Sequence, residues 1–262
     1  SPDRVALYAG GLVACYAVFL ATGHFDKIWL FDTQGRGRAI DFVAFWAAAK
    51  LAISDQAAAA YDVAIVTKMQ LTAVSSIGGQ YTWAYPPTYF LLIVPLALFS
   101  YATAAYIWMF TTLALYLGGI RAILPRWSAA LAAAASPFAL WTFYSGQNGF
   151  LTAALIAGTL ALLDRRPIAA GILLGLLTVK PQLGIAFPLI LILTGRWRVF
   201  IAAALTAVIL ALAAYLVFGA ETWSAFLDAI QHQAGAVLDR GEVAFRKQQT
   251  VHALMRLFGS SD

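Results

Sequence analysis

Apolar residues fill most of this chain, in long runs that short polar connections interrupt. The first run covers residues 5–22, and later runs cover 103–120, 128–144, 148–163, 168–179, 181–194 and 199–218. A helix needs about 20 apolar residues to cross a bilayer, so several of these runs are short for a full crossing. Short spans are tolerated where neighbouring helices bury them or where a cavity ends them. The pattern predicts an all-α, polytopic helical membrane protein.

Arginines in the short connections determine how these runs are threaded through a bilayer. Three connections carry such pairs: Arg121 and Arg126, Arg165 and Arg166, and Arg196 and Arg198. Because cytoplasmic loops are rich in Lys and Arg, we place all three on the inner side. This threading predicts seven spans and an outer side that holds residues 23–100, Gln147 and Lys180. Arg36 and Arg38 lie in the long outer loop, where the charge rule has little force.

Residues 84–99 are also apolar and allow two interpretations. As a full span they would move Arg121 and Arg126 to the outside, so we expect them to form an outer hydrophobic helix. The loop that contains them, residues 23–100, is also expected to hold two interfacial helices. In the first, residues 40–53, Phe42, Phe45, Trp46 and Ala49 recur with helical spacing. The second covers 62–74, with Asp62 as its N-cap.

Beyond Phe218, residues 219–262 are predicted to form an outer amphipathic tail, with Trp223, Phe226, Leu227 and Ile230 on one face. No repeat or linker divides the chain, so residues 1–262 are expected to form a single membrane domain. The chain begins at Ser1 and ends within the amphipathic stretch, so we expect a piece of a longer protein, truncated before further spans.

Composition supports the membrane assignment. The 262 residues are 62% hydrophobic and 11% charged, whereas soluble domains carry about 25% charged residues. The net charge of +5 comes from Lys and Arg standing between apolar runs, so it orients helices and predicts no binding of nucleic acid. Cys15 is the one cysteine, which excludes an internal disulfide. The first run lacks a clear cleavage site, so no cleavable signal peptide is expected.

Asp41 is the first candidate for chemistry. It stands at the start of the aromatic-rich helix over 40–53. A carboxylate there could accept a proton from a hydroxyl as a general base. The alternative is structural, because Asp is also a preferred helix N-cap. Asp26 and Asp32, in the same loop, are weaker candidates for the base.

Lys180-Pro181-Gln182 is the sharpest local signal, since a lysine between apolar runs is costly unless it is paired or faces a polar cavity. Its ammonium could bind a phosphate, and the Pro181 break could expose backbone N–H groups to the same anion. The alternative is a lysine that snorkels to anchor a helix end.

Gln147-Asn148 stands between two glycines at a tight turn. Its amides could bind sugar hydroxyls, or they could satisfy backbone groups at helix ends. Tyr85-Pro86-Pro87, preceded by Trp83, is typical of an aromatic belt and a helix start. The histidines, His24, His232 and His252, lack metal-ligand spacing, so no metal and no cofactor is expected.

These residues together resemble glycosyltransferase family 87. The likeness rests on an ordered set: Asp41-Phe42-x-x-Phe45-Trp46, Tyr61-Asp62, Tyr85-Pro86-Pro87, Gly146-Gln147-Asn148-Gly149-Phe150 and Thr178-x-Lys180-Pro181-Gln182. It runs from about Asp41 to Phe218. Members of that family are polyprenol-phosphate-mannose-dependent mannosyltransferases of the GT-C class, and they usually extend over ten or more spans. This sequence departs from that pattern by ending before such C-terminal spans, so we expect its acceptor side to be incomplete.

The resemblance implies an inverting transfer of mannose, or another hexose, from a polyprenyl-phosphate donor to a lipid or glycan acceptor. It implies Asp41 as the catalytic base, Lys180 and Gln182 at the donor phosphate, and Gln147, Asn148 and Tyr85 at the sugar or acceptor. We expect the protein in a bacterial plasma membrane, with its site on the periplasmic side. The alternative is a non-enzymatic transporter or binding protein for lipid-linked sugars, since intramembrane polar residues also suit a substrate pathway.

Overall fold

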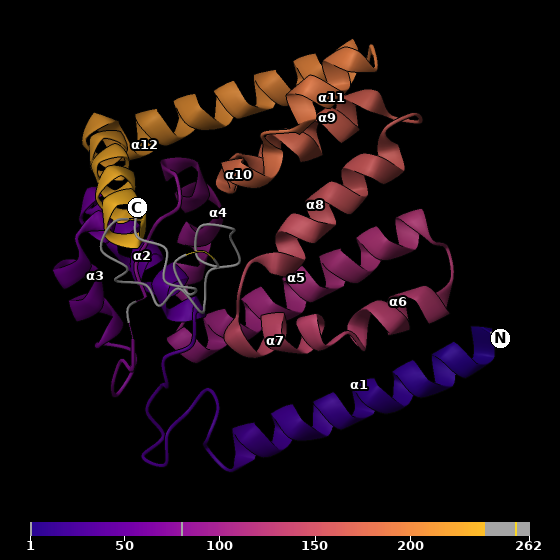
Figure 1. Ribbon diagram of the computed structural model, residues 1–262. Coiled ribbons are helices and arrows are strands. Elements are labelled where there is room, and N and C mark those ends of the chain that lie inside the picture. The colour runs from indigo at the N-terminus through magenta and orange to yellow at the C-terminus, as the bar shows by residue number, and fades with distance from the viewer. Residues whose placement is uncertain (1, 80, 239–254, 256–262) are drawn as a thin grey trace.

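The computed structural model describes residues 2–79, 81–238 and 255, and helices dominate these residues (Figure 1). The α-helices are α1 (Pro2–Phe25), α2 (Phe42–Ile53), α3 (Val63–Gln70), α4 (Phe90–Ile93), α5 (Tyr101–Ile123), α6 (Trp127–Ala134), α7 (Pro137–Ser145), α8 (Gly149–Leu162), α9 (Pro167–Gly175), α10 (Pro181–Gly184), α11 (Phe187–Leu193) and α12 (Trp197–Leu238). Short 3-10 helices are η1 (Ala57–Tyr61), η2 (Pro87–Tyr89), η3 (Val94–Leu98) and η4 (Leu176–Val179). The all-α prediction is confirmed.

Within the part of the chain that the structure describes, three helices are long and apolar enough to cross a membrane: residues 3–25 in α1, 101–123 in α5 and 197–232 in α12. Large apolar side chains on them point outward, as a lipid-facing surface requires. Leu7 is 73% exposed and Leu216 is 80% exposed. These helices indicate an integral membrane protein. The full set of seven spans stays a prediction, because the other apolar runs form shorter helices.

Prolines explain why most of the other apolar runs form short helices. The run over 128–144 is broken into α6 and α7, because Ser136 takes an extended conformation before Pro137. The run after Arg166 is divided into α9, η4, α10 and α11, with breaks at Pro181 and before Pro188. Residues 84–99 were expected to form one helix, and they form η2, α4 and η3 in succession. These elements follow one another without a gap, so residues 87–98 form the apolar helix that was expected, with Pro86 and Pro87 at its start.

Figure 1 shows the long elements side by side: α1 beside α6, then α5, α8, α9 and α12. Residues 26–100 gather at one end, together with the α7–α8 turn and the η4–α10 turn, on the left of the view. The α5–α6, α8–α9 and α11–α12 connections, which carry the arginine pairs, lie at the opposite end. There Arg196 forms a 2.5 Å ion pair with Asp164. The connections that carry the arginine pairs thus lie at the opposite end of the helices from residues 26–100 and the two turns, as the threading requires. The orientation of the protein in a membrane stays a prediction.

The layer at the left end has its own aromatic core. Most side chains of α2 are fully buried, and Trp83 stacks on both Tyr89 and Phe90 at centroid distances of 5.6 and 5.1 Å. Asp62 caps α3 by accepting from the backbone N–H groups of Ala64 and Ile65, as predicted. This layer forms a rigid floor for the polar residues described below.

The predicted tail is continuous with α12 as far as Leu238, with non-helical backbone at Gly219 (φ 79°, ψ 168°). Phe226 is buried and packs on Tyr61, whereas Leu227 and Ile230 are exposed. The residues expected on one apolar face of the tail therefore differ: Phe226 packs against the protein, whereas Leu227 and Ile230 face outward. Residues 239–254 and 256–262 lie outside the described residues.

Candidate active site

The backbone before Asp41 is held from two sides. The Tyr101 hydroxyl donates to the carbonyl of Arg38 at 2.9 Å, and the Ile40 N–H donates back to that hydroxyl at 3.4 Å. The Ser75 N–H donates to the Gly37 carbonyl at 3.0 Å. A Cβ at Gly37 would lie 2.4 Å from the Ala73 carbonyl oxygen, so no larger residue fits this crossing. These contacts fix where the chain enters α2.

The Asp41 side chain does not cap α2. Asp41 has helical backbone angles (φ −55°, ψ −27°), and its carboxylate makes no hydrogen bond to the first turn. Instead, Oδ2 accepts a 2.8 Å hydrogen bond from Nε2 of Gln147, a residue 106 positions away. The capping alternative is therefore wrong. A partly buried carboxylate held by a distant amide is oriented toward the interior of the site.

The turn that carries Gln147 is built by close packing. Gly146 has a left-handed backbone (φ 68°), and a Cβ there would lie 2.7 Å from Cβ of Phe42. The Trp108 indole N–H donates to the Gly146 carbonyl at 3.1 Å, and the Trp29 indole N–H donates to the Tyr144 carbonyl at 2.8 Å. Glycine thus lets the turn lie directly against the start of α2, next to Asp41.

Lys180 binds the same turn through Asn148, the residue that follows Gln147. Its Nζ donates to Oδ1 of Asn148 at 3.2 Å. Burial lowers the pKa of the Lys180 ammonium from its usual 10.5. Within the described residues Lys180 forms no ion pair with Asp41. Its ammonium points into the protein toward the turn, which disagrees with a lysine snorkelling to the surface.

A contact between η2 and η4 holds the segment that precedes Lys180. Thr88 Oγ1 donates to the Thr178 carbonyl at 3.5 Å, which ties η2 to η4. Pro181 breaks the chain as predicted, but α10 has four residues. The contribution of the backbone N–H groups after Pro181 to anion binding stays a prediction. The positive charge at this site comes from the lysine.

Tyr85 lies beside Asn148 and faces the Asp41 carboxylate. Burial raises the pKa of its hydroxyl to about 12, with the nearby Asn148 amide lowering that pKa and the Asp41 charge raising it. The hydroxyl therefore stays protonated at neutral pH and can donate a hydrogen bond. Tyr61 fixes this segment by donating from its hydroxyl to the Tyr85 carbonyl at 2.8 Å.

Three buried polar atoms here form no hydrogen bond of ordinary geometry within the described residues: the Tyr89 hydroxyl, Nδ2 of Asn148 and Oγ1 of Thr178. The Tyr89 hydroxyl nevertheless lies close enough to the Asn148 amide for that amide to lower its pKa. Buried polar groups are almost always hydrogen-bonded, so a cluster of orphans indicates a place for a polar ligand. The sequence pointed to Asn148 but missed Tyr89 and Thr178 as site residues. In the sequence, Tyr89 stands one helical turn after Tyr85, beyond Pro86 and Pro87. This spacing was the signal that could have identified Tyr89 as a second tyrosine of the site.

The remaining candidates lie elsewhere. Gln182 is exposed and lines a cavity beside α12. Asp32 binds Arg36 and nearby backbone N–H groups, and Asp62 caps α3. The His24 ring accepts or donates a 2.6 Å hydrogen bond with the Tyr106 hydroxyl. Among the described residues no three potential metal ligands come together, and His252 lies outside those residues.

The chain belongs to glycosyltransferase family 87, whose family model matches residues 83–262. No curated protein and no solved structure matches the chain. Membership implies an enzyme that transfers a sugar from a donor to an acceptor. Tyr85, Gln147, Asn148 and Lys180 lie within the matched residues, whereas Asp41 precedes them and enters the site through its bond to Gln147.

Proposed function

We propose that the protein transfers mannose, or a similar hexose, from a polyprenyl-phosphate donor to a hydroxyl of a lipid or glycan, with inversion at the anomeric carbon. One observation carries this proposal. The adjacent residues Gln147 and Asn148 bind Asp41 and Lys180 respectively, at 2.8 and 3.2 Å. A carboxylate and an ammonium thus flank one amide turn without neutralising each other, as base and leaving-group partner must.

Asp41 acts as the general base. Its carboxylate takes the proton of the acceptor hydroxyl as that oxygen forms its bond to the anomeric carbon. The bond from the anomeric carbon to the phosphate oxygen breaks at the same time, and its electron pair leaves with the polyprenyl phosphate. The hydrogen bond from Gln147 orients the carboxylate, and the proton then passes from Asp41 to water.

Lys180 stabilises the negative charge on the departing phosphate. A cation in a partly buried position interacts more strongly with an anion than one in water. Beside Lys180 lies a cavity of about 590 Å³ between η4, α10, α11 and α12. Most side chains that line it are apolar, and Thr178 and Gln182 are the polar ones. The isoprenoid chain of the donor fits this apolar space, with its phosphate at Lys180.

Tyr85, Tyr89 and Asn148 bind the sugar. The Tyr89 hydroxyl and Nδ2 of Asn148 are buried and form no hydrogen bond of ordinary geometry within the described residues, and the Tyr85 hydroxyl lies near the same amide. Sugar hydroxyls would supply those partners. The buried aromatic floor of Trp83 and Phe45 holds these side chains in place, because its rings pack edge to face at 6.2 Å. Reaction on the outer side of a bacterial plasma membrane belongs to the same proposal.

A non-enzymatic carrier of lipid-linked sugars is the rival function. Family membership favours the enzyme, and the candidate polar residues belong to segments at one end of the helices: residues 26–100, the α7–α8 turn and the η4–α10 turn. The experiment is transfer of radiolabelled mannose from polyprenyl-phosphate mannose, in membranes that express the full-length gene. The proposal predicts a labelled lipid or glycan product that empty membranes lack. Donor binding without product would favour the carrier.

A further inference from the structure

A second apolar cavity lies on the far side of the Gln147-Asn148 turn from Lys180. We propose that it holds the hydrocarbon chain of the acceptor, so that the acceptor is a membrane lipid whose headgroup carries the attacking hydroxyl. This inference rests on the proposed glycosyl transfer and names the class of acceptor. It assigns separate cavities to the two lipid chains.

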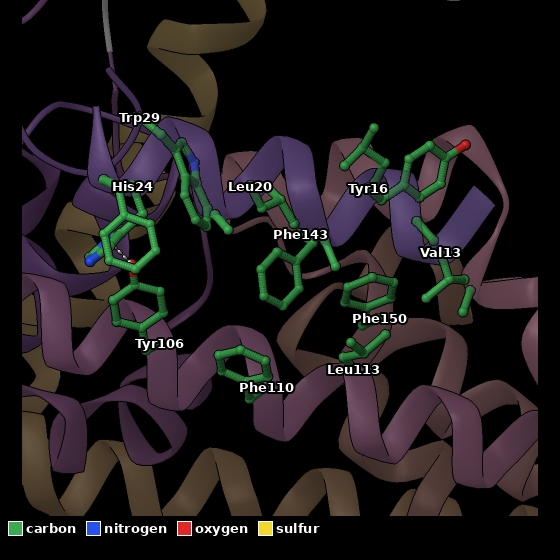
Figure 2. Close-up of a pocket in the computed structure, with 16 residues that line it drawn as sticks. Val13, Tyr16, Leu20, His24, Trp29, Tyr106, Phe110, Leu113, Phe143 and Phe150 are labelled. Atoms are coloured by element: carbon green, nitrogen blue, oxygen red, sulfur yellow. Dashed lines mark hydrogen bonds between the residues drawn. The ribbon is translucent and has the colours of Figure 1, made fainter. Parts of the chain in front are cut away.

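Figure 2 shows the cavity between α1 on one side and α5, α6 and α7 on the other. Its volume is about 490 Å³, and its lining is almost wholly apolar. Leu20, Phe110, Phe143 and Phe150 project into it from different helices. A space of this size and lining holds a hydrocarbon chain, and polar ligands would lose their hydration without gaining hydrogen bonds.

The cavity shares its wall with the candidate active site. Phe143 and Phe150 line it, and they stand on either side of the turn that carries Gln147 and Asn148. Trp29 also lines it, stacks on Tyr144 at 5.8 Å and donates to the Tyr144 carbonyl. A chain in the cavity therefore ends within a few residues of the Asp41–Gln147 pair.

Its position matches what an inverting reaction requires. The donor cavity is lined by residues of α9, η4 and α10–α12, whereas this cavity is lined by residues of α1 and α5–α7 and by Phe150 at the start of α8. In an in-line displacement the attacking oxygen approaches from the side opposite to the leaving phosphate. Because the donor chain is assigned to the cavity next to η4, the chain in this second cavity is assigned to the acceptor.

One end of the cavity is suited to a lipid headgroup. His24 and the Tyr106 hydroxyl form a 2.6 Å hydrogen bond there, at the end where Trp29 also lies (Figure 2). One wall of the cavity is α1, which carries His24 and is a candidate span whose outward side chains are exposed. A lipid could thus enter sideways from the bilayer with its polar end toward Asp41.

The test uses a hexadecyl mannoside with a photoactivatable diazirine at the chain end, added to the full-length protein in vesicles. Ala21→Phe adds bulk inside the cavity from an exposed position, so the fold should tolerate it. Ala14→Phe adds the same side chain to α1 outside the cavity. Ala204→Phe adds it to the donor cavity. Each variant is first checked for monodispersity and expression.

The proposal predicts crosslinks on peptides that contain Phe110 and Phe143. Ala21→Phe should reduce them by about fivefold or more, as expected for overpacking, whereas Ala14→Phe and Ala204→Phe should leave them unchanged. Excess polyprenyl phosphate should not compete. Absence of these crosslinks, equal labelling of Ala21→Phe, or competition by polyprenyl phosphate would each overturn it. Mannose transfer is measured separately, so correct crosslinks without any transfer would count against the proposed function and leave the lipid site standing.

Discussion

Nε2 of Gln147 donates a 2.8 Å hydrogen bond to Oδ2 of Asp41, across 106 positions of sequence. This bond brings the start of α2 and the turn between α7 and α8 into one site. It also explains why Asp41 leaves the first turn of α2 without a side-chain cap. An aspartate that gives up capping for a distant amide has a role that local helix stability does not explain.

Gln147→Ala should therefore impair catalysis more than folding. Removing the amide leaves the carboxylate without its orienting donor, and turnover should fall by about tenfold, the usual effect of losing a hydrogen bond to a charged group. The KM for the donor should change little, because Lys180 is bound by Asn148. Steady-state transfer kinetics measure both quantities. Normal turnover would mean that the bond serves the fold alone.

Lys180→Ala should raise the KM for the polyprenyl-phosphate donor by about tenfold or more, since it removes a charge-assisted contact. Lys50→Ala is the matched control, because Lys50 lies over the Trp46 ring at 5.3 Å and outside the site. The control should keep its donor KM. If the two variants behave alike, Lys180 does not contact the donor.

Donor binding should weaken at alkaline pH. Burial lowers the pKa of Lys180 below 10.5, so in the free enzyme the ammonium is lost as the pH rises through that lowered value. An anionic phosphate favours the charged lysine, and its affinity therefore falls as the pH rises. A profile of donor KM against pH measures this effect. Lys180→Arg should remove the rise, because a guanidinium stays charged throughout the range. A rise that persists in the arginine variant would assign it to another group.

The predicted orientation can be tested by labelling. After replacement of Cys15, single cysteines at Gln34, Gly79 and Arg165 are exposed to a membrane-impermeant maleimide in intact cells. The first two should react from outside, whereas the cysteine at Arg165 should react after the cells are opened. Outside labelling at Arg165 would contradict the threading.

Periodicity and charge predicted the helical class, the cap at Asp62 and the separation of the arginine pairs from the polar residues. They also predicted the break at Pro181, but they did not predict that Pro137 divides the run over 128–144, because an apolar run has the same composition whether or not its backbone is broken. The partner of Asp41 was also beyond the sequence. It depends on the close approach of Gly146 to Phe42, a tertiary contact that local patterns do not encode. Tyr89 and Thr178 were missed because both read as ordinary residues of apolar segments.

Asp41→Asn tests the central claim most directly, by measuring mannose transfer at equal expression. Asparagine has nearly the size of aspartate, but it cannot accept the acceptor's proton. The account predicts a loss of turnover of about 10²-fold or more, with donor binding retained and with Asp62→Asn close to wild type because Asn caps α3 equally well. Transfer by Asp41→Asn near the wild-type rate would contradict the assignment of Asp41 as the base.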